Sequence, residues 1–284
     1  MSFTKVLFRY GTWPVLFFGF GGVVVWLASA NVGVWPMFAV LAGAVAFSFL
    51  AERVIPYQPD WNRTHDDVAR DWLHALINTS LNRAALWLLP WLTWTALGGD
   101  FWPHTWPFAL QVVFAALILD LGIAMAHHAS HRFAPLWRFH AVHHSPRRLY
   151  GFNGLMKHPV HQAIETGSGV LPLLLLGIPF EVAITLPFLV VIALLCQHSN
   201  ADYRTGGFKY VFANAEVHRF HHANSADGDV NFGLFTVLYD RLMGTFRYEP
   251  EAAPRESRQI GIAGEQPYPV NYWAQLAEPF RPSQ

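Results

Sequence analysis

The chain has 284 residues, of which 53% are hydrophobic and 13% are charged, about half of the ~25% charged residues usual in soluble domains. Its 19 basic and 19 acidic residues cancel, which makes the chain a poor candidate for nucleic-acid binding, so no nucleic-acid partner is expected. The single cysteine, Cys196, excludes an internal disulfide and a cysteine-based zinc or iron–sulfur site.

The N-terminal part of the chain carries no charge over residues 10–51. A helix that spans a bilayer needs about 20 apolar residues. The run is therefore long enough for two helices, near Trp13–Ala30 and Val34–Leu50, with a turn at Asn31–Gly33. A cleaved signal peptide is the alternative for the first helix, because basic residues precede it. The second apolar block follows at once, which favours a transmembrane hairpin over residues 1–51.

Four further uncharged runs follow: Ala84–Gly99, Phe101–Leu119, Thr166–Phe180 and Val182–Ala201. We expect the helix of Ala84–Gly99 to start in the amphipathic stretch Trp72–Arg83, at the membrane surface, and to bend at Pro90 before it enters the bilayer. Thr166–Phe180 is short and contains proline and glycine. It is expected to enter only partway, as one arm of a re-entrant hairpin that returns through Glu181–His198.

Basic residues indicate which side of the membrane each loop occupies, because cytoplasmic loops are enriched in Lys and Arg. If the helices alternate, the N-terminus, the loop 52–71, residues 127–150 and the C-terminal region share one side. All but one of the 19 Lys and Arg residues then lie on that side. The exception, Arg83, lies in or beside a membrane segment. We therefore predict that the histidine-rich region is cytoplasmic.

These features predict an all-α multi-pass membrane domain, with about four transmembrane helices, a re-entrant hairpin and a cytoplasmic histidine-rich helical cap. Residues 52–247 form the predicted catalytic domain, between the N-terminal hairpin of residues 1–51 and a cytoplasmic tail of residues 248–284. The tail is rich in Pro, Glu and Arg and is expected to be a loosely packed surface extension. A short strand at Thr236–Tyr239 is possible in the pattern, but no sheet is expected.

Histidine is the residue type in excess, and 12 of the 15 histidines lie between His127 and His222. Eight of them form three clusters with spacings of three and four residues, which place side chains on one face of a helix. The clusters are His127 and His131, then His140, His143 and His144, then His218, His221 and His222. Eight imidazoles exceed one tetrahedral site twofold, which predicts two metal ions. His198 ends an apolar helix and is a candidate ninth ligand.

The remaining histidines are weaker candidates. His65, His74 and His104 have no patterned partner, so we expect them to be helix caps or surface residues. His128 points about 100° away from its neighbour His127, which favours a supporting or surface role over direct ligation.

Two more histidines and one acid lie close to the clusters in sequence. His158 and His161 are expected either to support the ligands or to act as occasional ligands. Asp120 lies two helical turns before His127 on the same face. It is either a buried structural acid or a carboxylate that orients a ligand imidazole, and the second role is favoured.

The pattern resembles the fatty acid hydroxylase/sterol desaturase superfamily of integral membrane di-iron enzymes. The resemblance covers roughly residues 50–247 and rests on Asp120, the three clusters, Leu136–Trp137, Asn153, His158–Pro159, His198–Ser199–Asn200, Asn231–Phe232–Gly233 and Tyr239–Thr245. Two departures are Ala124–Met125, where the family often has Tyr–Trp, and His128, where it has Arg. Neither removes a ligand.

The resemblance implies an enzyme that uses O2 and two Fe ions to hydroxylate or desaturate an unactivated C–H bond of a lipid, with Zn able to replace Fe in a preparation. The implied ligands are His127, His131, His140, His143, His144, His198, His218, His221 and His222. Four residues would orient ligand rings or cap the site: Asp120, Asp229, Asn231 and Asp240. The segments 107–126 and 166–197 would bracket the lipid chain.

The electrons must come from another protein, because the chain has no G-x-G-x-x-G fingerprint, C-x-x-C pair or haem-binding segment. A cytochrome b5-like protein, a ferredoxin or a flavin reductase is implied. Four arginines form a basic group that either docks an acidic donor or contacts lipid headgroups: Arg132, Arg138, Arg147 and Arg148.

Other classes of protein are less consistent with the pattern. A zinc hydrolase would need an open metal position and a general-base carboxylate, and H-E-x-x-H is absent. A metal transporter would need polar ligands at mid-bilayer, whereas these histidines lie at helix ends. A non-catalytic relative would be expected to lose ligands. The Gly- and Ala-rich helices and the short anchor favour a bacterial inner membrane, and a bacterial lipid over a sterol as substrate.

Overall fold

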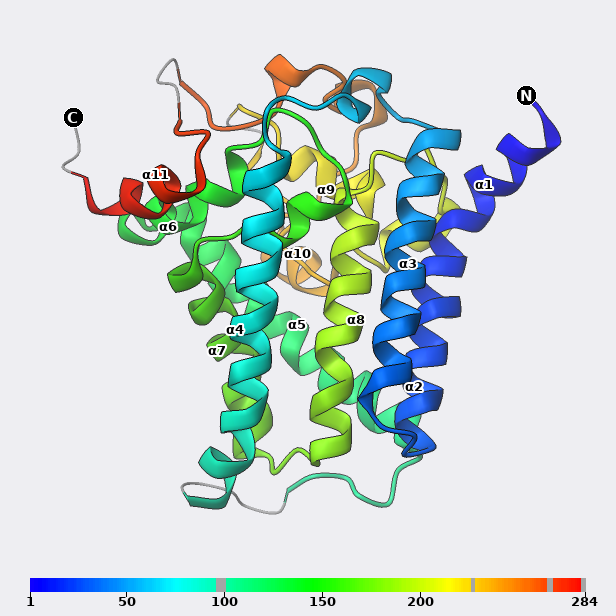
Figure 1. Cartoon of the computed structure of the whole chain (residues 1–284), viewed down its shortest axis with the longest axis vertical. Coiled ribbons are helices and arrows are strands. Elements are labelled where there is room, and N and C mark those ends of the chain that lie inside the picture. The colour runs from blue at the N-terminus through cyan, green and yellow to red at the C-terminus, as the bar shows by residue number, and fades with distance from the viewer. Residues whose placement is uncertain (96–100, 226–227, 265–267, 282–284) are drawn as a thin grey trace.

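The chain forms a bundle of long helices with a layer of short helices and loops at one end (Figure 1). This computed structural model describes residues 1–95, 101–225, 228–264 and 268–281, with no side-chain description for residue 83 or residues 85–95. Within this part of the chain, β pairing is limited to isolated bridges, one of which joins Phe212 to Thr236 where a strand was considered. The all-α class is confirmed.

The helices follow each other in the order that the charge pattern predicts. The bundle is built from α1 (Phe3–Pro14), α2 (Gly21–Ser29), α3 (Val34–Val54), α4 (Val68–Thr95), α5 (Phe108–Arg132), α7 (Pro159–Leu175) and α8 (Phe180–His198). A π-helical segment, Val15–Phe20, joins α1 to α2. The short helices are α6 (Ala134–His144), α9 (Ala215–His221), α10 (Leu238–Met243) and α11 (Tyr272–Ala277).

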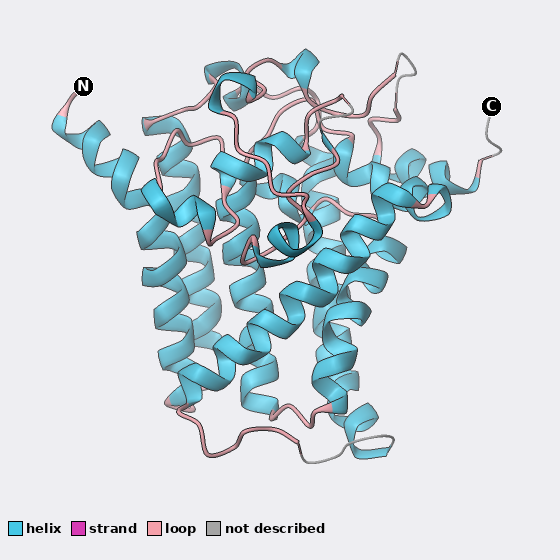
Figure 2. Cartoon of the chain, turned by 180° about the vertical axis from the view of Figure 1, so that it is seen from behind, coloured by secondary structure: helices cyan, strands magenta, loops and turns pink. Residues whose placement is uncertain are grey.

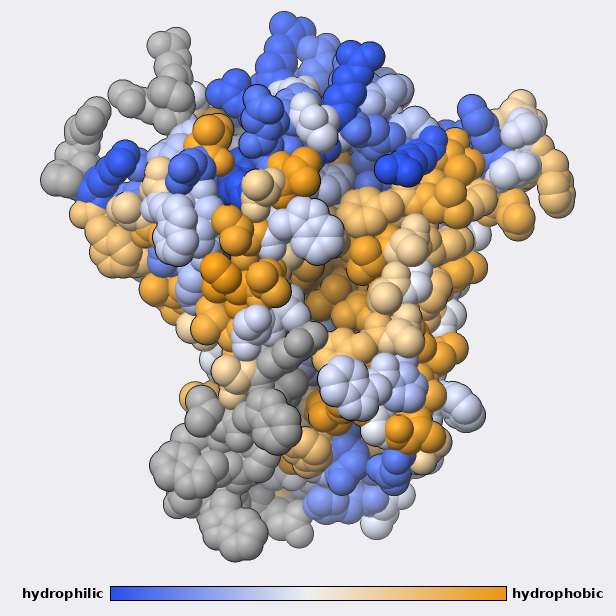
Figure 3. All heavy atoms as spheres, in the orientation of Figure 1, coloured by the Kyte–Doolittle hydropathy of each residue, from blue (hydrophilic) through white to orange (hydrophobic). Residues whose placement is uncertain are grey.

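Four of these segments are long and apolar enough to cross a bilayer: Phe3–Ser29, Val34–Val54, Phe108–Arg132 and Phe180–His198. Hydrophobic side chains form a band between two more hydrophilic ends (Figure 3). The prediction of about four transmembrane helices is confirmed. Since α8 is one of the four, its length alone allows it to cross the membrane, and a partial, re-entrant path for it stays a prediction.

The helix that was expected to begin before Ala84 does so, because α4 starts at Val68. It is one continuous helix that runs alongside α8 (Figure 1). The side chain of Pro90 lies outside the described residues, so the bend expected there stays a prediction. α7 reaches the end of the bundle at which α8 begins, and α5 crosses the back of the bundle obliquely (Figure 2).

α5 and α7 cross at very short distance because glycines face each other at the contact. A Cβ atom on Gly122 would lie 2.3 Å from the Ser168 carbonyl oxygen, and one on Gly169 would lie 2.6 Å from Leu119 Cδ1. Small residues allow this close approach of membrane helices. The segments 107–126 and 166–197 were expected to bracket a lipid chain, but at this crossing they pack against each other directly.

The C-terminal tail is more tightly packed than predicted. Tyr272 and Gln275 of α11 are buried, and Gln275 donates hydrogen bonds to Ser145 Oγ (3.1 Å) and Pro269 O (2.7 Å). The prediction of a loose extension is therefore wrong for this segment. Composition indicated a polar tail, but in the folded chain Tyr272 and Gln275 of α11 both contact a partner residue on α4.

That partner is His74, which was expected to be a cap or surface residue and is instead 1% exposed. Its Nδ1 atom lies 3.1 Å from Lys157 O and its Nε2 atom 2.9 Å from Gln275 Oε1. Burial lowers the pKa of His74 to about 4, although both hydrogen bonds act in the opposite direction. The folded protein therefore keeps this ring neutral where the unfolded chain would protonate it.

We expect acid to destabilise the protein through His74. Between pH 6.5 and about 4 the unfolded chain binds one more proton at this residue than the folded chain does, so stability falls as the pH falls. His74→Gln should reduce the drop in thermal midpoint between pH 7 and pH 5, measured in detergent, whereas His65→Gln at an exposed site should not. If the thermal midpoint of His74→Gln fell more than that of wild type, Lys157 O and Gln275 Oε1 would instead stabilise a charged His74 ring.

Candidate metal centre

Four helix ends carry the histidines toward one place at the capped end of the bundle. His127 and His131 lie in the last turns of α5, and His198 is the last residue of α8. α6 supplies His140, His143 and His144, and α9 supplies His218, His221 and the following residue His222. Residues four apart share a group, as helical periodicity predicts: His127 with His131, His140 with His144, and His218 with His222. The third member of each triplet, His143 or His221, belongs to the other group.

The first group contains five rings: His127, His131, His140, His144 and His221. The Nε2 atom of His144 lies 3.0 Å from that of His140, 3.0 Å from that of His221 and 3.2 Å from that of His131. The possible ligand atoms of all five lie within 4.8 Å of one another. His127 Nε2 is buried and has no hydrogen-bond partner within the described part of the chain.

The second group contains His143, His198, His218 and His222, all buried. The Nε2 atom of His198 is central, at 3.1 Å from His218 Nε2, 3.2 Å from His222 Nε2 and 3.4 Å from His143 Nε2. Consecutive residues on α6 and at the end of α9 serve different groups, because neighbours on a helix point about 100° apart. The two groups therefore lie side by side.

Hydrogen bonds on the far side of the rings fix where the protons are. The Nδ1 atom faces a carbonyl oxygen in His127 (Phe232 O, 3.1 Å), His143 (Met156 O, 3.2 Å), His198 (Leu194 O, 3.1 Å) and His221 (Val230 O, 2.9 Å). A carbonyl only accepts, so each Nδ1 carries the proton and each Nε2 presents a lone pair. Lone pairs about 3 Å apart repel each other unless a cation lies between them.

Burial keeps the rings in the form that binds a metal. In α6 and around α9, desolvation and then the neighbouring histidines lower the pKa of every ring well below its usual value: His140, His143, His144, His218, His221 and His222. A neutral imidazole is the state that coordinates metals. With metal–nitrogen bonds of about 2.0–2.1 Å, nitrogens of one coordination shell lie about 3.0–3.4 Å apart, which these Nε2 spacings match. The nine residues fit two metal ions.

Asp229 is the predicted supporting acid that touches a ligand ring. Its Oδ1 atom lies 2.8 Å from His131 Nδ1, an arrangement that orients the ring and makes it a stronger ligand. The His131 hydrogen bond, the largest contribution, lowers the pKa of Asp229, so the carboxylate is charged at neutral pH.

Asp120, Asp240 and Asn231 act on a loop rather than on a ring. Asp120 accepts hydrogen bonds from the backbone N–H groups of Leu234 (2.7 Å), Phe235 (2.9 Å) and Thr236 (3.0 Å). Asp240 accepts from the N–H groups of Phe232 (2.8 Å) and Gly233 (2.9 Å), and Asn231 has a left-handed backbone with φ = 58°. The loop they hold, residues 230–236, carries the carbonyls that orient His127 and His221.

His158 and His161 have different surroundings. His161 Nε2 lies 2.8 Å from His140 Nδ1 and 3.1 Å from Glu165 Oε1, so it stands directly behind a ring of the first group. Glu165 in turn pairs with the buried Lys157. His158 caps α7 by accepting from Val160 N (3.1 Å), and this places it in the helix start rather than among the ligands.

Sequence reasoning did not find Glu165, although its spacing of four residues from His161 was a usable signal. It also did not distinguish the arginines of the predicted docking group. Arg148 is 4% exposed and forms two 2.7 Å bonds to Asp67, so it is not available to a partner protein. Arg132, Arg138 and Arg147 are exposed, and Arg138 donates a hydrogen bond to the backbone carbonyl of Arg281. His128 lies 3.0 Å from the Tyr239 hydroxyl, at the edge of the site.

Comparisons with known proteins agree with this geometry. A family model for fatty acid hydroxylase matches residues 112–245. The chain is 35% identical over 254 residues to the ornithine lipid hydroxylase OlsE of Rhizobium tropici, covering 85% of this chain and 74% of that protein. It is 29% identical over 154 residues to an alkylglycerol monooxygenase of Danio rerio, covering 53% of this chain and 32% of that protein. No solved structure matches. The chain belongs to the fatty acid hydroxylase superfamily.

Proposed function

We propose that the protein is a membrane-bound lipid hydroxylase that uses O2, two iron ions and electrons from a separate donor. The observation that carries this proposal is the convergence of nine lone-pair-bearing imidazoles into two buried groups. One relative is named for hydroxylation of ornithine lipid, and two are named for monooxygenation of an alkylglycerol. These names favour hydroxylation over desaturation, and a polar membrane lipid over a sterol.

The reaction would insert one oxygen atom of O2 into a C–H bond and release the other as water, with two electrons and two protons from the donor. Iron, when bound, supplies the oxidising chemistry that no side chain can supply. The chain's own residues keep the ligands neutral, fix the ring orientations through the loop 230–236 and Asp229, and exclude water by burying both groups.

We further propose that the capped end of the bundle faces the cytoplasm of a bacterial inner membrane. The N-terminus, the loop after α3, α6 and the C-terminal region all lie at this end (Figure 1). The positive-inside rule assigns that end to the cytoplasm. A cytochrome b5-like protein, a ferredoxin or a flavin reductase would reach the exposed Arg132, Arg138 and Arg147 there.

The alternative is a non-catalytic or zinc-dependent membrane metalloprotein, a hydrolase or a metal transporter. Among the described residues, the five-ring and four-ring groups contain only histidines. The carboxylate beside His140 and His161, Glu165, pairs with Lys157, which disfavours its use as the general base of a zinc hydrolase.

Metal analysis and isotope labelling test the proposal. We expect two irons per chain after purification without added metal, and oxygen-dependent product whose mass rises by 18 with ¹⁸O2 and by 16 with ¹⁶O2. A product lighter by 2 would indicate desaturation. One zinc per chain, with activity unaffected by oxygen, would establish the alternative.

A further inference from the structure

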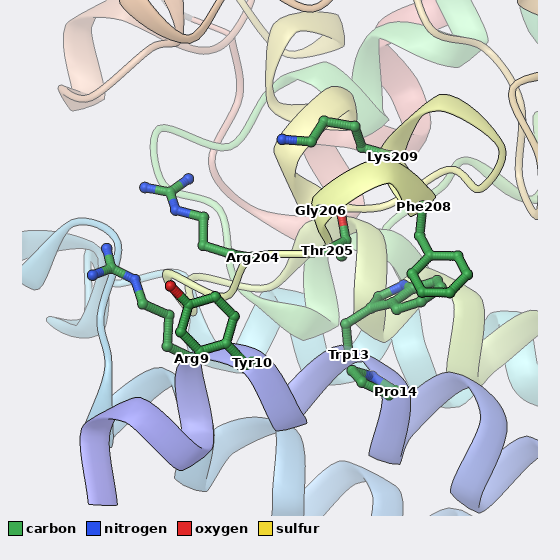
Figure 4. A pocket seen from close by; sticks show the side chains of 9 residues that line it. All are labelled: Arg9, Tyr10, Trp13, Pro14, Arg204, Thr205, Gly206, Phe208 and Lys209. Carbon is green, nitrogen blue, oxygen red and sulfur yellow. The ribbon is translucent and has the colours of Figure 1, made fainter. Parts of the chain in front are cut away.

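A second site lies between α1 and the 3₁₀ helix η4 (Gly206–Tyr210), where a pocket of about 600 Å³ is formed (Figure 4). Arg9, Tyr10 and Trp13 line it from α1, and residues 204–209 line it from the other side. None of the nine clustered histidines is among its lining residues.

The pocket carries more positive than negative charge. Arg9 pairs with Asp202, and Arg204 lies 3.0 Å from Asp202 and 3.6 Å from Glu216. Lys209 lies 3.1 Å from the same Glu216. Three cations thus share two carboxylates, which leaves one positive charge in excess. The side chain of Arg204 is 39% exposed, so an anion in the pocket can approach it.

The pocket also has a charged end and an aromatic end. The cationic groups of Arg9, Arg204 and Lys209 point toward one side (Figure 4). On the other side lies the exposed ring of Phe208, with the fully buried Trp13 behind it. These two rings are 5.4 Å apart between centroids. A molecule with an anionic head and an apolar body matches this division.

Helix length places the pocket at the surface of the bilayer. The segment Phe3–Ser29 has 27 residues, or roughly 40 Å of helix, whereas the hydrocarbon layer is about 30 Å thick. About 20 residues counted back from Ser29 reach Tyr10, so Arg9 and Tyr10 lie at the level of the lipid headgroups. Phe3 and Leu7 are exposed on the first turns of α1, which diverge from the bundle (Figure 1).

We propose that this pocket binds the anionic headgroup, phosphate or carboxylate, of a membrane lipid on the histidine-rich side of the bilayer. Arginine and lysine bind such oxyanions, and tryptophan and tyrosine favour the interface. A lipid in this pocket contacts both α1 and the segment 204–209, which line it. That segment is tied to α9, because Thr205 donates from its N and Oγ1 atoms to Glu216 at 2.6 Å each. Glu216 lies in the first turn of α9. The site is separate from the proposed oxygenase reaction and does not depend on it.

The test is the thermal midpoint of the full chain in detergent, with dioleoyl phosphatidylglycerol, dioleoyl phosphatidylcholine or inorganic phosphate added. Phosphatidylglycerol near 100 times its dissociation constant should raise the midpoint by roughly 5–10 °C, and 0.5 M NaCl should reduce the shift. Equal shifts with phosphatidylcholine would overturn the proposal. An equal shift with inorganic phosphate would also overturn it, in favour of a free anion.

Variants locate the effect. The double variant Arg204→Gln/Lys209→Gln should lose at least half of the shift, and Arg204→Lys should keep it. Lys5→Gln is the matched control, because Lys5 is an exposed cation of α1 that does not line the pocket. A full shift in the double variant would contradict the proposal. If that variant does not fold, native mass spectrometry of Arg204→Gln should show less retained phosphatidylglycerol than Lys5→Gln, and equal retention would contradict it.

Discussion

His144→Ala is expected to abolish turnover and to remove one of the two metal ions. The Nε2 atom of His144 is the most central of the five-ring group, within 3.0–3.2 Å of three other Nε2 atoms. Loss of a residue that merely supports a ligand costs 10–100-fold in activity or metal affinity, so loss of this ligand should exceed roughly 100-fold. His143, the next residue, belongs to the other group, which should keep its metal.

The measurement is metal content per chain together with product formation from a lipid substrate. His65→Ala is the control, because it removes an exposed histidine outside both groups. If His144→Ala kept both metals and activity within a few-fold of wild type, the five-ring group would not be a metal site.

Asp120→Ala is expected to destabilise the protein and to empty the metal centre without removing any ligand. Its buried carboxylate is the acceptor for three backbone N–H groups of the loop 230–236. Unpaired buried donors cost about 1–3 kcal/mol each, which corresponds to a fall in thermal midpoint of roughly 6–12 °C for a total near 3 kcal/mol. The same loop orients His127 and His221, so metal content should fall as well.

Asp120→Asn separates the two causes, since an amide oxygen can still accept some of these hydrogen bonds. It should lie between wild type and Asp120→Ala in both thermal midpoint and metal content. Asp60→Ala, at an exposed acid, should behave as wild type. An unchanged midpoint and metal content in Asp120→Ala would mean that other contacts hold the loop.

The two largest effects thus concern one structural unit. Asp120 of α5 and Asp240 of α10 hold the loop 230–236 from opposite ends, and the carbonyls of this loop fix the protons on two ligand rings. Asp120 therefore acts on the ring orientation of His127 and His221 through this loop, without touching either ring. This accounts for the sequence spacing between Asp120 and His127 without direct contact between carboxylate and imidazole.

Local periodicity and composition were enough to predict several features of the fold and of the site. The long apolar runs predicted the spanning helices, because crossing a bilayer requires about 20 apolar residues whatever the rest of the chain does. The four-residue spacings His140/His144 and His218/His222 predicted rings that share a face, because helical geometry is local. The family resemblance rested on the same motifs.

Which rings meet, and which polar groups are buried, depends on contacts between segments far apart in the chain. His143 and His144 are neighbours in sequence but serve different groups, since their partners come from helices far along the chain. His74 and Arg148 were expected to be exposed, yet both are buried. His74 contacts Gln275, 201 positions away, and Arg148 contacts Asp67, 81 positions away. No short-range pattern encodes such contacts, because burial is a property of the assembled bundle and not of the segment that carries the residue.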